Sequence, residues 1–181
     1  MMKKILYILV LVSALFLITG CDDEKSTNES GQEKINKIES NGEKVNTKKM
    51  TQMYCIRNAT AQNGIEVNIH YDVFYTGDKL NIVHSFEQVM SANSEYLDEY
   101  EEAYRGIHKH YEGLEYYDAS VTRGDTAVTS EITINYDKLD IDKLLSIEGE
   151  ENNIFENKVP KYSKWIAMAK KVGVTCTEVE K

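Results

Sequence analysis

The stretch Gly64–Met90, GIEVNIHYDVFYTGDKLNIVHSFEQVM, carries the clearest structural pattern in the chain. Apolar and polar side chains alternate on both sides of Gly77-Asp78, and such a dipeptide between two alternating segments is typical of a two-residue β-hairpin turn. One face of the predicted hairpin is apolar and the other is mostly polar. Its register is therefore well specified, because a one-residue slip would exchange the two faces.

Two sets of facing pairs follow from this register. On the apolar face the predicted partners are Tyr75 with Leu80, Val73 with Ile82, Tyr71 with His84, Ile69 with Phe86, and Ile65 with Met90. On the polar face they are His70 with Ser85, Asn68 with Glu87, and Asp72 with Val83. Because side chains alternate along a strand, His70 and His84 are expected to point to opposite faces.

The chain after this hairpin predicts a helix and then a second hairpin. Apolar residues recur at helical spacing over residues 94–111. The second hairpin is expected to turn at Gly124-Asp125, which sets Asp118 directly opposite Glu131 on its outward face. Like charges in facing positions destabilise a sheet, so a cation or a basic partner would relieve this pair.

Terminal strands are predicted near residues 51–61 and 174–177, with Cys55 on the first and Cys176 on the last. Two further helices are expected between the second hairpin and the final strand. The predicted fold is α+β, an antiparallel β-sheet built from two hairpins plus terminal strands and covered on one side by two or three helices.

The N-terminus, MMKKILYILVLVSALFLITGC, has the features of a secretory signal. Two lysines precede about 14 apolar residues, too few for a membrane-spanning helix, which needs roughly 20. The segment ends in Ile18-Thr19-Gly20-Cys21, which is similar to a bacterial lipobox. That similarity implies a signal peptide over residues 1–20 and a lipid, diacylglycerol or palmitate, on Cys21. An ordinary signal cut elsewhere and an uncleaved anchor are the alternatives.

A flexible polar tether is predicted over residues 21–48, followed by a single domain over residues 49–181. The tether has few apolar side chains, too few to offset the entropy cost of ordering it. The chain as a whole carries a formal net charge of −9. This disfavours nucleic acid and anionic lipid headgroups as partners, because both are bound through clustered Lys and Arg. Cationic ligands, metal ions and basic protein surfaces remain open as partners, and so does an acidic surface that serves solubility alone.

The three cysteines divide into one plus two. If Cys21 carries the lipid, Cys55 and Cys176 are left, and an even pair in an exported protein is typical of a disulfide. Two buried free thiols are the alternative. A metal site is less favoured, because neither cysteine has a second ligand at CxxC spacing.

Catalytic motifs of the common hydrolase, metalloprotease, nucleotide-binding and dinucleotide-binding types are missing from the sequence. The nearest approach to a nucleophile and base is the predicted facing pair of Ser85 and His70. We therefore expect no catalysis, no metal site and no cofactor. A weak candidate face for a small ligand or cation consists of Asp72, Asp118 and Glu131.

The order of these segments resembles the YehR-like bacterial lipoproteins, a family grouped as a domain of unknown function. The resemblance covers about residues 50–180 and is carried by five segments: residues 64–67, 77–79, 111–114 and 134–140, and Gly173 with the strand that follows it. None of them is catalytic, since they are turns, caps and core positions. The resemblance implies an exported, lipid-anchored α+β domain and brings no established activity.

From the sequence, the expected protein is a lipid-anchored lipoprotein on the extracytoplasmic side of a bacterial membrane, of Gram-positive type. Its domain is expected to be a non-catalytic protein-interaction or envelope-assembly module. The alternative is a small-ligand or cation carrier that uses the acidic sheet face. A pocket closed by helices over the sheet would favour the carrier, and a flat sheet with an exposed aromatic patch would favour the interaction module.

Overall fold

The computed structural model describes residues 38–61, 64–150 and 154–180 and contains one six-stranded antiparallel sheet. The strand order is β10-β3-β4-β5-β7-β6. These strands are β3 (Thr51–Thr60), β4 (Glu66–Thr76), β5 (Lys79–Met90), β6 (Tyr117–Arg123), β7 (Ala127–Asn135) and β10 (Thr175–Glu178). Two small hairpin sheets accompany it: β1 (Ile38–Ser40) with β2 (Glu43–Val45), and β8 (Phe155–Glu156) with β9 (Val159–Pro160).

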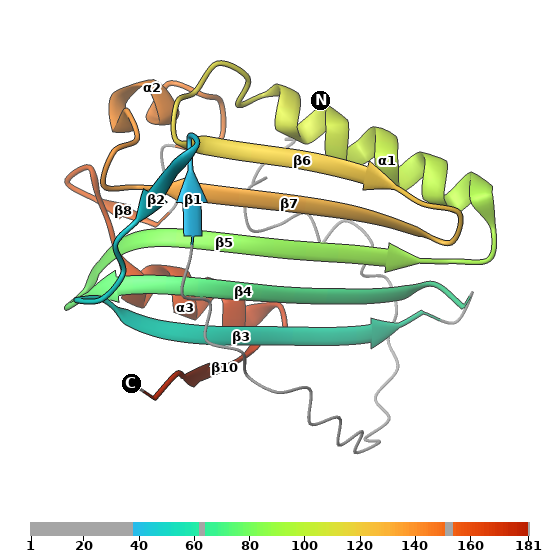
Figure 1. Ribbon diagram of the computed structural model, residues 1–181, viewed down its shortest axis with the longest axis horizontal. Helices are drawn as coiled ribbons and strands as arrows, with labels where there is room; N and C mark the ends of the chain where they lie inside the picture. The colour runs from blue at the N-terminus through green and yellow to red at the C-terminus, as the bar shows by residue number, and fades with distance from the viewer. Residues whose placement is uncertain (1–37, 62–63, 151–153, 181) are drawn as a thin grey trace.

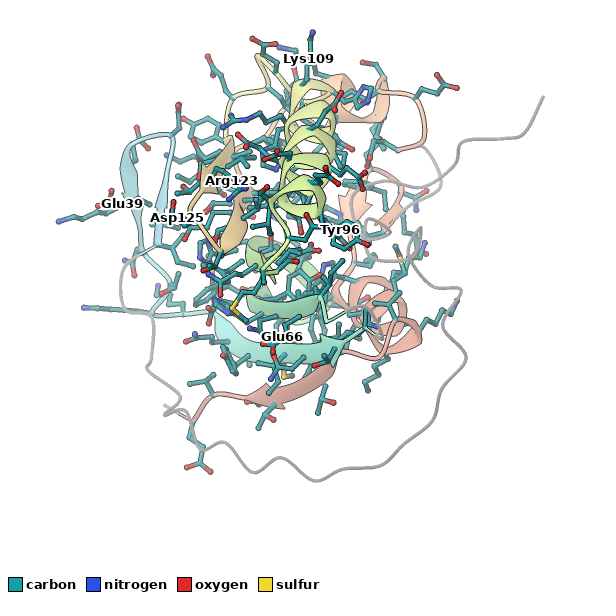
Figure 2. The ribbon with its side chains drawn as sticks, turned by 90° about the vertical axis from the view of Figure 1, so that its right-hand side faces the viewer. Glu39, Glu66, Tyr96, Lys109, Arg123 and Asp125 are labelled. Carbon is teal, nitrogen blue, oxygen red and sulfur yellow. A yellow bond between two sulfur atoms is a disulfide. The ribbon has the colours of Figure 1, made fainter. Side chains whose placement is uncertain are left out.

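Three helices complete the fold: α1 (Ser94–Lys109), α2 (Ile141–Leu145) and α3 (Tyr162–Lys171). Figure 1 shows α3 behind the sheet and the β1–β2 hairpin in front of it. In the side view of Figure 2 the hairpin lies to the left of the sheet, and α3 lies to the right. The predicted α+β class, with helices on one side of an antiparallel sheet, is confirmed. In the three described ranges no helix is both long and apolar enough to span a bilayer.

The helix-covered face of the sheet is filled by apolar side chains. Trp165 of α3 is 2% exposed and meets Tyr71 of β4 edge to face, with ring centroids 5.4 Å apart. Leu97 of α1 is fully buried and packs in a second cluster with Val89 and Val128. These buried side chains place the core of the domain between the helices and the sheet.

The first hairpin has the predicted turn and a different register beyond it. Gly77 has a φ of 61°, which suits a tight hairpin turn, and Tyr75 faces Leu80 as predicted. The next pair is Phe74 with Ile82, so Asn81 is an extra residue in β5. This is a β-bulge, and it moves every following side chain of β5 to the opposite face.

The predicted facing pairs beyond Leu80 are therefore wrong. The structure pairs Val73 with Val83, Asp72 with His84, Tyr71 with Ser85, His70 with Phe86, Ile69 with Glu87, Asn68 with Gln88, and Glu66 with Met90. The bulge is held from outside the hairpin, since the Asn81 Nδ2 atom donates to both carboxylate oxygens of Asp137 at 3.0 and 2.9 Å. The Asn81 carbonyl also accepts a hydrogen bond from the Tyr136 N–H at 2.8 Å.

The second hairpin turns one residue later than predicted. The Gly124 N–H donates to the Ala127 carbonyl at 2.8 Å, so Asp125 and Thr126 are the central residues of the turn. Each facing pair consequently shifts by two residues, and the two faces keep their composition because two is the side-chain period. The prediction that Asp118 directly faces Glu131 is wrong.

The predicted tether is structured in its last part. Residues 38–45 form the β1–β2 hairpin, and Ile38 is 4% exposed in a cluster with Phe74 and Ile82. The boundary between tether and domain at residues 48 and 49 is therefore too late in the chain. The signal segment, Cys21 and the first part of the predicted tether lie outside the described residues.

The predicted disulfide is confirmed. Cys55 of β3 and Cys176 of β10 are joined through their sulfur atoms, and the two strands are neighbours in the sheet. Cys55 is fully buried in the main core cluster. The bond ties the last strand of the domain to the first long strand, 121 residues earlier.

Candidate functional site

The candidate site is the sheet face opposite the helices, between the β1–β2 hairpin and the far end of the strands. We call it the open face and define it by alternate residues of five strands. Its members are Tyr54, Ile56, Asn58, Thr60, Glu66, Asn68, His70, Asp72, His84, Phe86, Gln88, Met90, Asp118, Ser120, Thr122, Ala127, Thr129, Glu131 and Thr133. In the part of the chain that the structure describes, no helix lies on this face (Figures 1 and 2).

One row of side chains crosses the middle of the open face. Pairing between neighbouring strands sets Ile56 beside His70, His70 beside Phe86, Phe86 beside Glu131, and Glu131 beside Ser120. Ile56 is 40% exposed, and among the large apolar residues of the described ranges only Val159 is exposed to a similar degree. The row thus runs from apolar through aromatic to acidic.

The aromatic rings of this region lie against one another. The His70 ring stacks on the Phe86 ring with centroids 4.5 Å apart and planes 6° from parallel. The Tyr54 ring lies 6.1 Å from His70 on the other side. Partial burial lowers the pKa of His70, and the neighbouring His84 lowers it further, although Glu131 acts in the opposite direction.

Asp72 lies on the open face and is covered by its neighbours. Its side chain is 1% exposed, and Oδ1 accepts a hydrogen bond from the Gln52 Nε2 atom at 2.8 Å. Burial raises the pKa of this carboxyl, although the Gln52 hydrogen bond and His84 act in the opposite direction. Within the described ranges, Oδ2 of Asp72 has no hydrogen-bond partner.

The three acids of the predicted ligand face share one side of the sheet and do not converge. Asp118 accepts a hydrogen bond at Oδ2 from the Asn41 N–H at 2.8 Å and so anchors the β1–β2 hairpin. Glu131 is exposed, and it lies diagonally from Asp118, at roughly 7–8 Å between Cα atoms for such neighbours. Asp72 is three strands away from Asp118, or about 14 Å at the usual strand spacing.

The predicted pair of Ser85 and His70 is separated by the sheet. The bulge places Ser85 on the helix-covered face and leaves His70 on the open face. The same shift brings His70 and His84 to one face, which corrects the prediction that they point apart. Among residues 38–61, 64–150 and 154–180, no group of three or more His, Cys, Asp or Glu side chains is placed to hold a metal ion.

Most of the space between the helices and the sheet is filled, also where its groups are polar. Burial raises the pKa of Glu87, which lies on this side of the sheet. The Tyr111 hydroxyl donates to Oε1 of the buried Glu150 at 2.8 Å. Hollows are present on the outer side of α1 and between α1 and β6, both open to the surface.

Sequence reasoning missed two residues of this face, Phe86 and His84, because it assigned both to the core. A local signal is present in the adjacent apolar residues Ile82 and Val83, which break the alternation of β5. Such a break is compatible with a bulge, and it does not say where the extra residue lies.

Comparison with known proteins gives two similar solved structures. The NMR structure of the E. coli YehR protein is 19% identical, covers 76% of this chain and 96% of its own, and has a TM-score of 0.48. The NMR structure of a protein from Streptococcus pneumoniae TIGR4 is 16% identical, covers 88% of this chain and 99% of its own, and has a TM-score of 0.43. No family model and no curated protein matches the chain. Membership of the family that the sequence resembles stays a prediction.

Proposed function

We propose that this chain is a lipoprotein anchored through Cys21 to the extracytoplasmic side of a bacterial membrane, and that its domain binds another envelope protein through the open face. The proposal assigns no catalysis to the domain. The observation that carries it is the row of Ile56, His70 and Phe86 on the sheet face that lies on the side away from the helices. Exposed apolar and aromatic side chains that lie together are typical of protein-binding surfaces.

The anchor rests on the N-terminal sequence. Lys3 and Lys4, the apolar run after them and the lipobox-like end at Cys21 together favour lipidation. If residues 22–37 form the flexible tether that their composition predicts, the domain lies on average about 20–25 Å from the membrane. A domain on such a tether reaches partners in the same membrane.

The carrier alternative receives less support from the geometry. A small-molecule site is normally a concave pocket that encloses most of its ligand. Here the helix-covered face is packed with Trp165, Leu97 and their neighbours, and the open face is a sheet surface. The three candidate acids also lack a common centre at which an ion would meet them together.

The test is photo-crosslinking in intact cells, with p-benzoylphenylalanine placed at Ile56 of the full chain. The matched control places it at Val159 of β9, an apolar residue of nearly equal exposure, 38% against 40%, outside the open face. We expect a protein adduct of discrete mass from position 56 and none from position 159. Equal adducts from both positions, or none from position 56, would reject the open face as the binding surface.

The anchor is tested in the same cells with radiolabelled palmitate. We expect label on the wild-type chain, no label on the Cys21→Ser variant, and a weaker crosslink from position 56 in that variant. Equal labelling of both chains would remove the anchor from the proposal and leave the crosslinking result to stand alone.

A further inference from the structure

The open face has a one-sided charge. Its carboxylates are Glu66, Asp72, Asp118 and Glu131, and none of its members, as defined above, is a lysine or an arginine. The arginine of β3, Arg57, and the arginine of β6, Arg123, lie on the helix-covered face. A surface that carries acids and aromatic rings and lacks basic side chains complements a cationic partner.

Ring geometry fixes the position at which such a cation fits. The His70 and Phe86 rings lie on the neighbouring strands β4 and β5 and stack with their centroids 4.5 Å apart, close to the spacing between strands. The planes of both rings are therefore roughly perpendicular to the direction of the row. His70 therefore occupies one side of the Phe86 ring. The other side is turned toward β7, where Glu131 is the direct strand partner of Phe86.

We propose that an arginine of a basic, extended segment of the partner protein stacks on the Phe86 ring, on the side turned toward Glu131, and pairs with the Glu131 carboxylate. Guanidinium is planar, so it stacks on an aromatic face and meets a carboxylate through two N–H groups at once. Glu131 is exposed and free to adjust its rotamer. This inference deepens the proposed function and rests on it.

A second feature adds to the negative charge of the open face. Oδ2 of Asp72 lacks a hydrogen-bond partner in the described ranges. Asp72 lies two residues along β4 from His70, the strand partner of Phe86. A buried acceptor without a donor is costly, and it adds to the negative potential of the face. The negative potential of the open face and the free side of the Phe86 ring together favour an arginine side chain of the partner over an apolar one.

The test measures binding of a fluorescent ten-residue peptide of alternating arginine and threonine to the full chain in nonionic detergent. Matched probes replace arginine by lysine or by citrulline, the neutral isostere of arginine. We expect the lysine peptide to bind about threefold more weakly and the citrulline peptide at least about tenfold more weakly. Equal binding of the arginine and citrulline peptides would overturn the proposal.

Variants of the chain locate the site. We expect Glu131→Gln and Phe86→Leu each to weaken the arginine peptide by about two- to fivefold, and Phe86→Trp to preserve binding. The matched control is Glu102→Gln, which removes the same charge from an exposed position on α1. Equal weakening by Glu131→Gln and Glu102→Gln would show general charge attraction and reject the subsite.

The outcomes separate this inference from the proposed function. A discrete crosslink from position 56 together with no binding of the arginine peptide would keep the interaction surface and reject the basic partner. Absence of both results would reject both. Binding of calcium or spermidine that Glu131→Gln abolishes, without peptide binding, would identify a small cation as the occupant and overturn the proposal.

Discussion

The two faces of the six-stranded sheet are made by the same strands and differ in what covers them. On one face Trp165, Leu97 and Leu144 are each no more than 2% exposed beneath or within the helices. On the other, Ile56 is 40% exposed, and Phe86 and His70 are half-buried against each other. Apolar side chains on the first face hold the fold together. On the second face Phe74 and Ile82 are buried beneath the β1–β2 hairpin, whereas Ile56 stays exposed.

The difference between the faces depends on one residue. Without the bulge at Asn81, Phe86 and His84 would lie in the core, and Val83 and Val89 would lie on the open face. The β1–β2 hairpin would also lose its docking site, since Ile38 packs on Ile82 as well as on Phe74. A bulge is thus a means of giving one strand two different patterns along its length.

The largest contrast is expected from truncating one aromatic residue on each face. Trp165→Ala should lower the free energy of unfolding by roughly 3–5 kcal/mol, because it opens a cavity in the packed core. Phe86→Ala should lower it by about 1 kcal/mol, mostly through the lost stack on His70. Urea denaturation of both variants measures the two changes. Equal losses would mean that Phe86 is a core residue and that the two faces are not distinct.

An intermediate effect is expected from deleting Asn81. Removal of the extra residue leaves a regular ladder in which Ile82 still faces Phe74, so the domain should fold. The loss is expected to be about 2–3 kcal/mol, because both hydrogen bonds to the Asp137 carboxylate disappear. Urea denaturation and the NOE between the His70 and Phe86 rings report the result.

Asn81→Gly is the control for this deletion, since it removes the same side-chain bonds and keeps the residue count. Loss of cooperative unfolding in the deletion variant alone would contradict the bulge. In a hairpin without a bulge, the deletion would invert every residue of β5 from position 82 onward.

The smallest effect is expected from Asp72→Asn. Burial raises the pKa of Asp72, so the ionised carboxyl destabilises the folded state above its folded pKa, and this penalty fades as the pH falls through that value. The variant should be more stable than the wild type near pH 8, by less than about 1 kcal/mol, and should lose this advantage toward pH 4. Thermal unfolding across this range measures the difference, and an advantage that grows toward low pH would contradict the assignment.

The features of the fold that could be predicted are local or obligatory. The Gly77-Asp78 turn was identifiable from its dipeptide and flanking alternation, and the Cys55–Cys176 bond from an even cysteine pair on terminal strands. The α+β class followed from the order of periodic segments. The turn and the periodic segments are signalled by residues that are close in sequence. The disulfide is signalled because each of the two cysteines has only the other one as a possible partner.

Two of the errors have their origin in distant contacts. The bulge at Asn81 is stabilised by Asp137, 56 residues further along the chain, and nothing in the sequence around Leu80 requires it. The β1–β2 hairpin has strands of three residues each, too short for a periodic signal, and depends on Phe74 and Ile82. Assigning Ile82 to the core removed the docking site of Ile38, so the second error followed from the first.

The candidate site inherited these errors. Asp72, Asp118 and Glu131 were correctly assigned to one side of the sheet, because alternation fixes the face of a residue even where its partner is misjudged. Their distances depend on register, and register was wrong in both hairpins. Phe86 could not be assigned to the site at all, because its face is set by the bulge.

The Cys55–Cys176 bond also determines how the domain bears mechanical load. A pull on the N-terminal side meets the β1–β2 hairpin first, which is fastened by the Asn41–Asp118 hydrogen bond and by the Glu43–Lys138 ion pair. Once the hairpin peels away, the pull reaches β3 and stops at Cys55, which is covalently tied to β10. Only residues 38–54 can then be drawn out, a length on the order of 60 Å. For a load applied between the two ends of the chain, the disulfide carries the force past residues 56–175, so this part of the chain is not drawn out.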